Sequence, residues 1–150
     1  MSAPDLPPAV AVVQGGAAIA TLRLSYEERL VRRKRLATLE GPMVLVDLPQ
    51  VASLNHGDRL RLADGRLVAV EAAAEPLMDI RGDLPRLAWH IGNRHAPCQI
   101  ETDRLLIRRD VVLEKMLAGL GARVTHLMAP FTPEGGAYGH GRTFGHDHAH

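Results

Sequence analysis

The spacing of apolar residues changes near Glu71, and this change constrains the fold more than any other feature of the chain. Before Glu71, short apolar stretches alternate with turn signals, a rhythm typical of β-strands. After it, two segments carry helical spacing and the segments around them carry strand spacing. We therefore expect an α+β protein with two small domains that meet near residues 72–75.

Residues 1–72 predict an N-terminal β domain that follows a loose, proline-rich start. The apolar stretches lie at 18–24, 43–48, 59–62 and 67–71. Asp64-Gly65, between the last two stretches, favours a tight hairpin. The charged segment 26–35 interrupts the pattern and predicts a helical turn or an exposed loop.

Residues 73–134 predict strands and helices in the order βαββαβ. The expected strands are 76–80, 97–100, 105–107 and 123–128. Asp83 is the candidate cap of the first helix and Gly92 its end, while Asp110 and Gly121 bound the second helix. This order is that of the ferredoxin-like fold, in which two helices cover one face of an antiparallel sheet.

Composition excludes several classes of protein. The chain has 150 residues, of which 46% are hydrophobic and 23% charged, so it is expected to be folded and soluble. No apolar run approaches the roughly 18–20 residues of a membrane span, and the N-terminus lacks the pattern of a signal peptide. Cys98 is the single cysteine, which excludes an internal disulfide and a multi-thiolate zinc site. We expect a cytoplasmic protein whose net charge of +1 gives no general attraction to nucleic acid or to a membrane.

The histidines are unevenly distributed along the chain. Four of the eight lie in the glycine-rich segment 135–150, which predicts a flexible tail: His140, His146, His148 and His150. Neutral imidazole suits zinc, copper, iron and nickel, so we expect the tail to bind metal, more weakly as pH falls through about 6.5. A solvated polar tail and an expression tag are the alternatives.

His95 lies in a predicted loop between Gly92 and Pro97. A lone histidine is more often structural or solvent-facing than a metal ligand. In a two-fold symmetric dimer, however, a residue near the axis meets its own copy, and two His95 imidazoles would then provide two ligands. The sequence does not establish such an axis.

The segment 89–95, WHIGNRH, resembles the metal-binding motif of the UreE family of urease accessory proteins. The likeness continues through Pro97, Gln99-Ile100 and the helix at 110–116, and it includes the domain junction at 67–76 and the histidine-bearing tail. It covers essentially the whole chain.

The resemblance implies a nickel metallochaperone that delivers Ni²⁺ for assembly of the urease active site and is not an enzyme. Residues 1–72 would contact partners, residues 73–134 would bind metal and form the homodimer, and residues 135–150 would be the flexible tail. The family pattern assigns nickel binding at the dimer interface to His95, and less sharply to His140, His146, His148 and His150. Zn²⁺ or Cu²⁺ would also occupy the site in vitro. The implied partners are a urease accessory GTPase and the urease apoprotein complex.

One position departs from the family pattern. Some members carry His-Asp-His at the start of the second helix of the metal-binding domain, where this chain has Arg109-Asp110-Val111. We therefore expect no additional metal site there, and about one interfacial ion per dimer.

Two other functions fit the sequence less well, and a third stays open. The basic strip 29–35 resembles a nucleic-acid contact, but Glu27 and Glu28 offset its charge and Tyr26 is the only aromatic residue nearby. Hydrolase and phosphate-binding motifs are absent from the sequence. General buffering or sensing of divalent metals on the same scaffold stays open.

Overall fold

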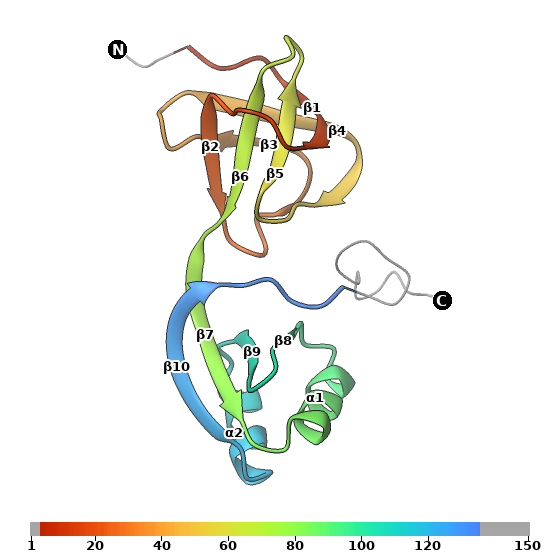
Figure 1. Cartoon of the computed structure of the whole chain (residues 1–150), viewed down its shortest axis with the longest axis vertical. Coiled ribbons are helices and arrows are strands. Elements are labelled where there is room, and N and C mark those ends of the chain that lie inside the picture. Colours follow the sequence, from red (N-terminus) through yellow and green to blue (C-terminus); the bar gives the residue numbers. More distant parts are fainter. Residues whose placement is uncertain (1–3, 136–150) are drawn as a thin grey trace. The chain divides into compact units, whose positions relative to one another are not determined.

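The computed structural model describes residues 4–135, which form two units divided between Ala73 and Ala74. The tail histidines His140, His146, His148 and His150 lie outside the described residues. The first unit contains strands only, and the second combines a sheet with two helices, as the change of rhythm near Glu71 predicted. Figure 1 labels these elements.

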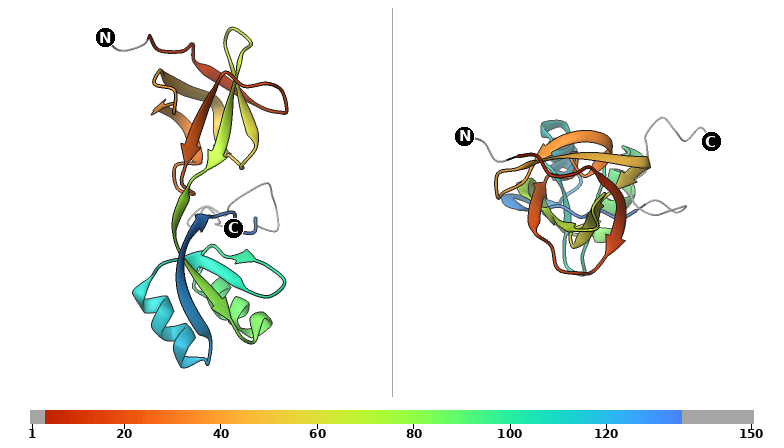
Figure 2. Two further views of the ribbon diagram at one scale, coloured as in Figure 1. Left: turned by 60° about the vertical axis from the view of Figure 1, so that its left-hand side comes forward. Right: turned by 90° about the horizontal axis from the view of Figure 1, so that it is seen from above.

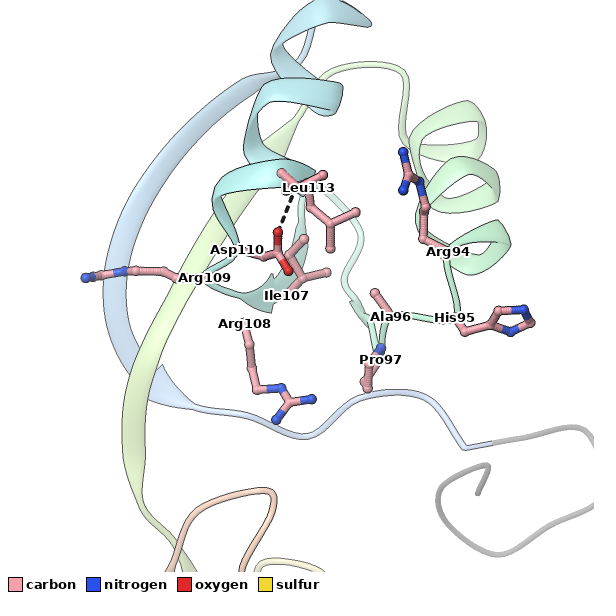
Figure 3. A pocket seen from close by; sticks show the side chains of 10 residues that line it. Arg94, His95, Ala96, Pro97, Ile107, Arg108, Arg109, Asp110 and Leu113 are labelled. Carbon is pink, nitrogen blue, oxygen red and sulfur yellow. Dashed lines mark hydrogen bonds between the residues drawn. The ribbon is translucent and has the colours of Figure 1, made fainter. Parts of the chain in front are cut away.

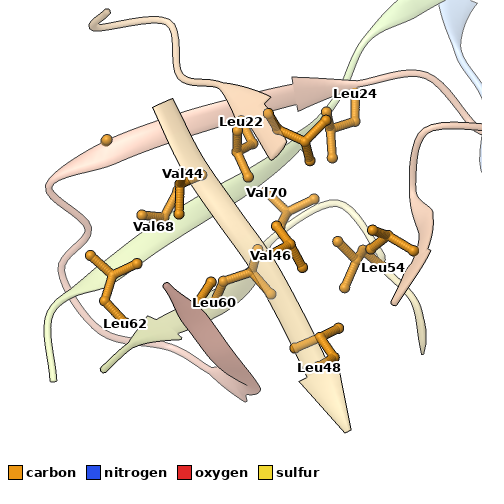
Figure 4. Packing of buried hydrophobic residues seen from close by; sticks show 14 residues of the cluster. Leu22, Leu24, Val44, Val46, Leu48, Leu54, Leu60, Leu62, Val68 and Val70 are labelled. Atoms are coloured by element: carbon orange, nitrogen blue, oxygen red, sulfur yellow. The ribbon is translucent and has the colours of Figure 1, made fainter. Parts of the chain in front are cut away.

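The first unit is a six-stranded mixed sheet. Its strands are β1 (Ala9–Gln14), β2 (Ala20–Leu24), β3 (Leu30–Ala37), β4 (Met43–Ser53), β5 (Asp58–Leu62) and β6 (Leu67–Ala72). They are hydrogen-bonded in the order β2-β6-β5-β1-β4-β3 and curve around one aliphatic core (Figure 2). Figure 4 shows Leu and Val side chains from β2, β4, β5 and β6 meeting in that core. The predicted hairpin at Asp64-Gly65 joins the antiparallel strands β5 and β6 and is confirmed.

The charged segment 26–35 differs from its prediction in its second half. A turn does occupy the first half, closed by a hydrogen bond from the Arg29 N–H to the Ser25 carbonyl. From Leu30 onward the chain is strand β3, at the edge of the sheet. In a regular strand, residues five apart face opposite sides of the sheet, yet Val31 and Leu36 are both buried. A register shift after Val31 turns Leu36 back toward the core. The exposed basic residues between them suit an edge strand, since charge discourages pairing with another chain.

Arg29 also differs from its prediction as part of an exposed basic strip. Its side chain is buried, with 2% of the residue exposed, and donates hydrogen bonds to the carbonyl oxygens of Leu54 and Leu24. Its guanidinium lies over the Tyr26 ring. Arg29 therefore ties the turn to the neighbouring strands and is not available to a partner.

The second unit has the element order that its sequence predicted. Its elements are β7 (Ala74–Arg81), α1 (Leu84–Asn93), β8 (Gln99–Ile100), β9 (Leu105–Arg108), α2 (Val111–Gly119) and β10 (Arg123–Pro130). The antiparallel sheet has the order β10-β7-β9-β8. One core cluster joins Leu87 and Ile91 of α1, Leu113 and Leu117 of α2, and residues of β7 and β9. Both helices therefore pack on the same face of the sheet.

Within residues 4–135, no helix is long and apolar enough to cross a membrane.

Candidate metal site

The C-terminal end of α1 places His95, and it does so through an uncommon backbone conformation. The helix ends with Arg94 as its last half-helical residue, and His95 follows with a φ of 58°, in the left-handed region. The N–H of His95 donates to the Gly92 carbonyl (2.9 Å), and the N–H of Ala96 donates to the Ile91 carbonyl (3.3 Å). These two bonds form the Schellman turn that ends many helices.

The sequence placed the end of α1 at Gly92, and this was wrong. Gly92 lies inside the helix, and the left-handed position that glycine usually occupies is taken by His95. The corresponding turn at the end of α2 does use glycine: Gly121 has a φ of 89° and bonds in the same pattern. His95 is the only residue other than glycine with a positive φ among those that the structure describes.

The imidazole of His95 is exposed and, in the described part of the chain, forms no hydrogen bond or ion pair. It lies at the rim of a pocket of about 500 Å³ between the end of α1 and the start of α2. Figure 3 shows its ring pointing away from the other side chains that line this pocket. Both ring nitrogens are therefore accessible to a ligand that approaches from outside the pocket.

The pocket itself does not suit a cation. Arg94, Arg108 and Arg109 all line it, and their positive charges would repel a metal cation there. The one carboxylate in the lining, Asp110, accepts a hydrogen bond from the Leu113 N–H (3.0 Å) as the N-cap of α2. That confirms the role predicted for Asp110. A metal ion held by His95 would lie on the outer side, where the imidazole points.

Cys98 lies three residues after His95, but its thiol is poorly suited to hold a metal. The residue packs against the core of the second unit. Burial, with a smaller effect of the Glu134 charge, raises the pKa of the thiol to about 11. Because the thiolate is the form that binds metals, this shift makes Cys98 a poor candidate ligand.

Two further histidines of the described chain, for which the sequence predicted no role, have hydrogen-bonding partners within the chain. The Nδ1 of His56 accepts a hydrogen bond from the Ala72 N–H (3.1 Å), and the Nε2 of His126 lies 2.9 Å from the Glu114 carboxylate. No local sequence signal marks either contact, since the partners are 16 and 12 residues away.

No group of three or more His, Cys, Asp or Glu side chains gathers at one point between residues 4 and 135. Of the four histidines in this range, His95 is the exposed one whose imidazole forms no hydrogen bond or ion pair. The fourth, His90, is partly buried, and its ring contacts that of Trp89 edge to face.

Comparison with known proteins identifies the same two units. Residues 7–73 match the N-terminal domain, and residues 69–150 the C-terminal domain, of the family described as UreE urease accessory protein. A urease accessory protein UreE of Rhodobacter capsulatus is 61% identical over 127 residues, which cover 85% of this chain and 81% of the relative. The UreE of Paracoccus denitrificans is 64% identical over 120 residues (80% and 77%), and that of Cereibacter sphaeroides 59% over 133 residues (89% and 73%).

Proposed function

Because the chain belongs to the UreE family of urease accessory proteins, we propose that it binds Ni²⁺ and delivers it during urease maturation, with His95 as the central ligand. The family consists of accessory chaperones and not of enzymes. The observation that carries the nickel assignment is the exposed, unpaired imidazole of His95 on its Schellman turn. A rigid backbone beneath a free side chain suits a ligand that must accept a metal and then release it.

One imidazole does not hold Ni²⁺ firmly, so further ligands must come from outside the described residues of one chain. We assign them to the His95 of a second copy and to His140, His146, His148 and His150. Nitrogen ligands bind nickel well. Because the site would contain no thiolates, it would lack the ligands that bind zinc and copper(I) most tightly. Zn²⁺ and Cu²⁺ would compete for the same imidazoles in vitro.

The homodimer in this proposal is supported by exposed apolar side chains on the two helices. Trp89 in α1 is 64% exposed, and Val111 and Val112 at the start of α2 are 70% and 62% exposed. Val112 lines the same pocket as His95. Contact with a second copy would remove these side chains from water and bring two His95 residues together at the axis.

The proposal also divides the roles along the chain. Residues 73–134 form the metal-binding and dimerisation domain, whose βαββαβ order and β10-β7-β9-β8 sheet support the ferredoxin-like class. Residues 1–72 contact the partners, an accessory GTPase and the urease apoprotein, and residues 135–150 contribute the tail ligands. The single cysteine is consistent with action in the reducing cytoplasm.

The nickel assignment is tested by calorimetric titration of the full chain with Ni²⁺. His95→Gly removes the imidazole while keeping a residue that accepts the left-handed turn, and we expect it to weaken nickel binding by at least tenfold. His90→Ala is the matched control, because it removes an imidazole from α1 and should leave the affinity unchanged. Equal affinity of His95→Gly and the native protein would refute the interfacial site.

Delivery is separated from general metal buffering by a second measurement, because imidazoles also bind Zn²⁺. We expect the native chain, but not His95→Gly, to restore urease activity in nickel-limited cells that lack their own accessory protein of this family. Restoration by the His95→Gly variant would favour a buffer that is not dedicated to urease.

A further inference from the structure

Strand β3 of the first unit carries four consecutive basic residues, at positions 32–35, and all four are exposed. The strand lies at one end of its sheet, and within residues 4–135 it pairs with β4 alone. Both strands are labelled in Figure 1. The other side of β3 therefore has no strand hydrogen-bonded to it in the described part of the chain.

The positive charge of this segment is only partly compensated. Arg33 and Arg35 lie 4.0 Å and 2.8 Å from carboxylates of the same unit. Among the residues that the structure describes, Arg32 and Lys34 form no ion pair. The carboxylate of Glu28 does not reach them, since it accepts a backbone N–H of the preceding turn (2.8 Å). Two exposed cations of β3 are thus left without an acidic partner in this range.

An apolar side chain is exposed on the neighbouring strand. The ladder between β3 and β4 is interrupted at Arg32, where this one residue lies opposite residues 48–51 of β4. Because β4 is the longer strand at this point, it bulges, and Val51 is 53% exposed. Arg32, Lys34 and Val51 together are called the basic edge below.

We propose that the basic edge binds an extended acidic segment of a partner protein, with carboxylates against Arg32 and Lys34 and an apolar side chain against Val51. The inference deepens the proposed function and rests on it, because there residues 1–72 contact the partners. The charge on β3 discourages pairing with β3 of a second copy, since like charges would then face each other. An acidic segment meets no such repulsion, so the charge selects the partner.

A nucleic acid is the other polyanion that this charge would attract, and the surroundings of β3 favour the acidic segment. The aromatic residue nearest to the strip in the sequence, Tyr26, is buried (7% exposed) and offers the bases no surface for stacking. The side chain exposed beside Arg32 is the aliphatic Val51, which suits an apolar side chain of a peptide.

The probe is a fluorescent peptide in which glutamate alternates with threonine around a central leucine, and anisotropy measures its binding to the full chain. Arg32→Glu combined with Lys34→Glu reverses the charge of the basic edge. The matched control combines Arg61→Glu with Lys115→Glu. Both control residues are exposed and form no ion pair within residues 4–135, and their replacement changes the net charge equally.

We expect the charge-reversed edge to bind the peptide at least fivefold more weakly than the native chain at low salt, and the control to bind within twofold. Added salt should weaken native binding, because exposed charges are screened. Arg32→Lys with Lys34→Arg keeps both charges and should bind like the native chain. Val51→Ser should weaken binding about threefold at high salt as well, because it removes an apolar contact.

Three results would overturn the inference. An equal loss in the control would show attraction to net charge and not to this edge. No loss in the charge-reversed edge would show that the peptide binds elsewhere or not at all. Tighter binding of a single-stranded oligonucleotide of similar length and charge would make the edge a nucleic-acid contact.

The affinity of the same variants for Ni²⁺ separates this inference from the proposed function. We expect the charge-reversed edge to bind Ni²⁺ like the native chain and yet to restore less urease activity in nickel-limited cells. If the native chain binds Ni²⁺ but not the acidic peptide, the inference fails alone. If the native chain does not bind Ni²⁺, the proposed function fails.

Discussion

At the scale of single residues, His95 places an imidazole at a position whose backbone is left-handed. A left-handed backbone costs an ordinary L-residue about 1–2 kcal/mol, and glycine avoids this cost. At the end of α2, the corresponding left-handed position is occupied by Gly121, which has no side chain. A strained backbone at His95 agrees with the metal-binding role that we propose for it, since such strain is often found at functional sites.

This conformation predicts an unusual order of stabilities. We expect His95→Gly to be more stable than His95→Ala by about 1 kcal/mol, because only glycine relieves the left-handed strain. The matched control is His90, which lies inside α1. There we expect His90→Ala to be more stable than His90→Gly by a similar amount, because glycine weakens a helix interior. Denaturant unfolding of the four variants measures both differences. The same order at both positions would contradict the assigned turn.

At the scale of elements, the two helices begin differently although the sequence predicted an aspartate cap for each. Asp110 accepts the Leu113 N–H and caps α2. Asp83 occupies the cap position of α1, but its side chain makes no capping hydrogen bond, and a proline takes the first turn instead. The start of α2 thus depends on one carboxylate that also lines the pocket beside His95.

The cap of α2 predicts a stability change without a change in metal binding. We expect Asp110→Ala to destabilise the protein by about 1 kcal/mol, since the Leu113 N–H loses its acceptor. Asp110→Asn keeps an acceptor oxygen and should cost less than half as much. Thermal unfolding measures stability, and nickel stoichiometry should be unchanged in both variants. A lost nickel equivalent would instead make Asp110 a ligand.

At the scale of the whole molecule, the chain builds two separate hydrophobic cores, one in each unit. The first is built from Leu, Val and Ala of the six-stranded sheet, and the second from both helices and the four-stranded sheet. No residue belongs to both clusters. The candidate metal site, at the ends of α1 and α2, depends on the second core alone.

This division predicts that a core mutation acts on one unit at a time. Leu60→Ala, in the first core, and Leu87→Ala, in the second, should each cost about 2–5 kcal/mol. Hydrogen exchange resolved by residue should show faster opening of residues 9–72 in the first variant and of residues 74–130 in the second. Faster exchange across both units in either variant would mean that they unfold together.

The sequence by itself determined most elements of the second unit, the Asp110 cap, the hairpin at Asp64-Gly65 and the family. These follow from local spacing and from short motifs. It did not reveal β3, because four consecutive charges and a register shift hide the alternation that marks a strand. Nor did it reveal the burial of Arg29, whose partner Leu54 is 25 residues away.

For the site, the sequence identified His95, but only the tertiary structure decided how that residue is held. Gly92 looked like the end of α1, whereas the hydrogen bonds of Ala96 and His95 to Ile91 and Gly92 put His95 itself in the glycine-like position. The hydrogen bond from the Thr132 N–H to the Gln99 side chain was equally hidden, since it joins residues that are 33 apart in the chain. Local spacing can show which side chains are present, but contacts between distant segments decide which of them are fixed, free or buried.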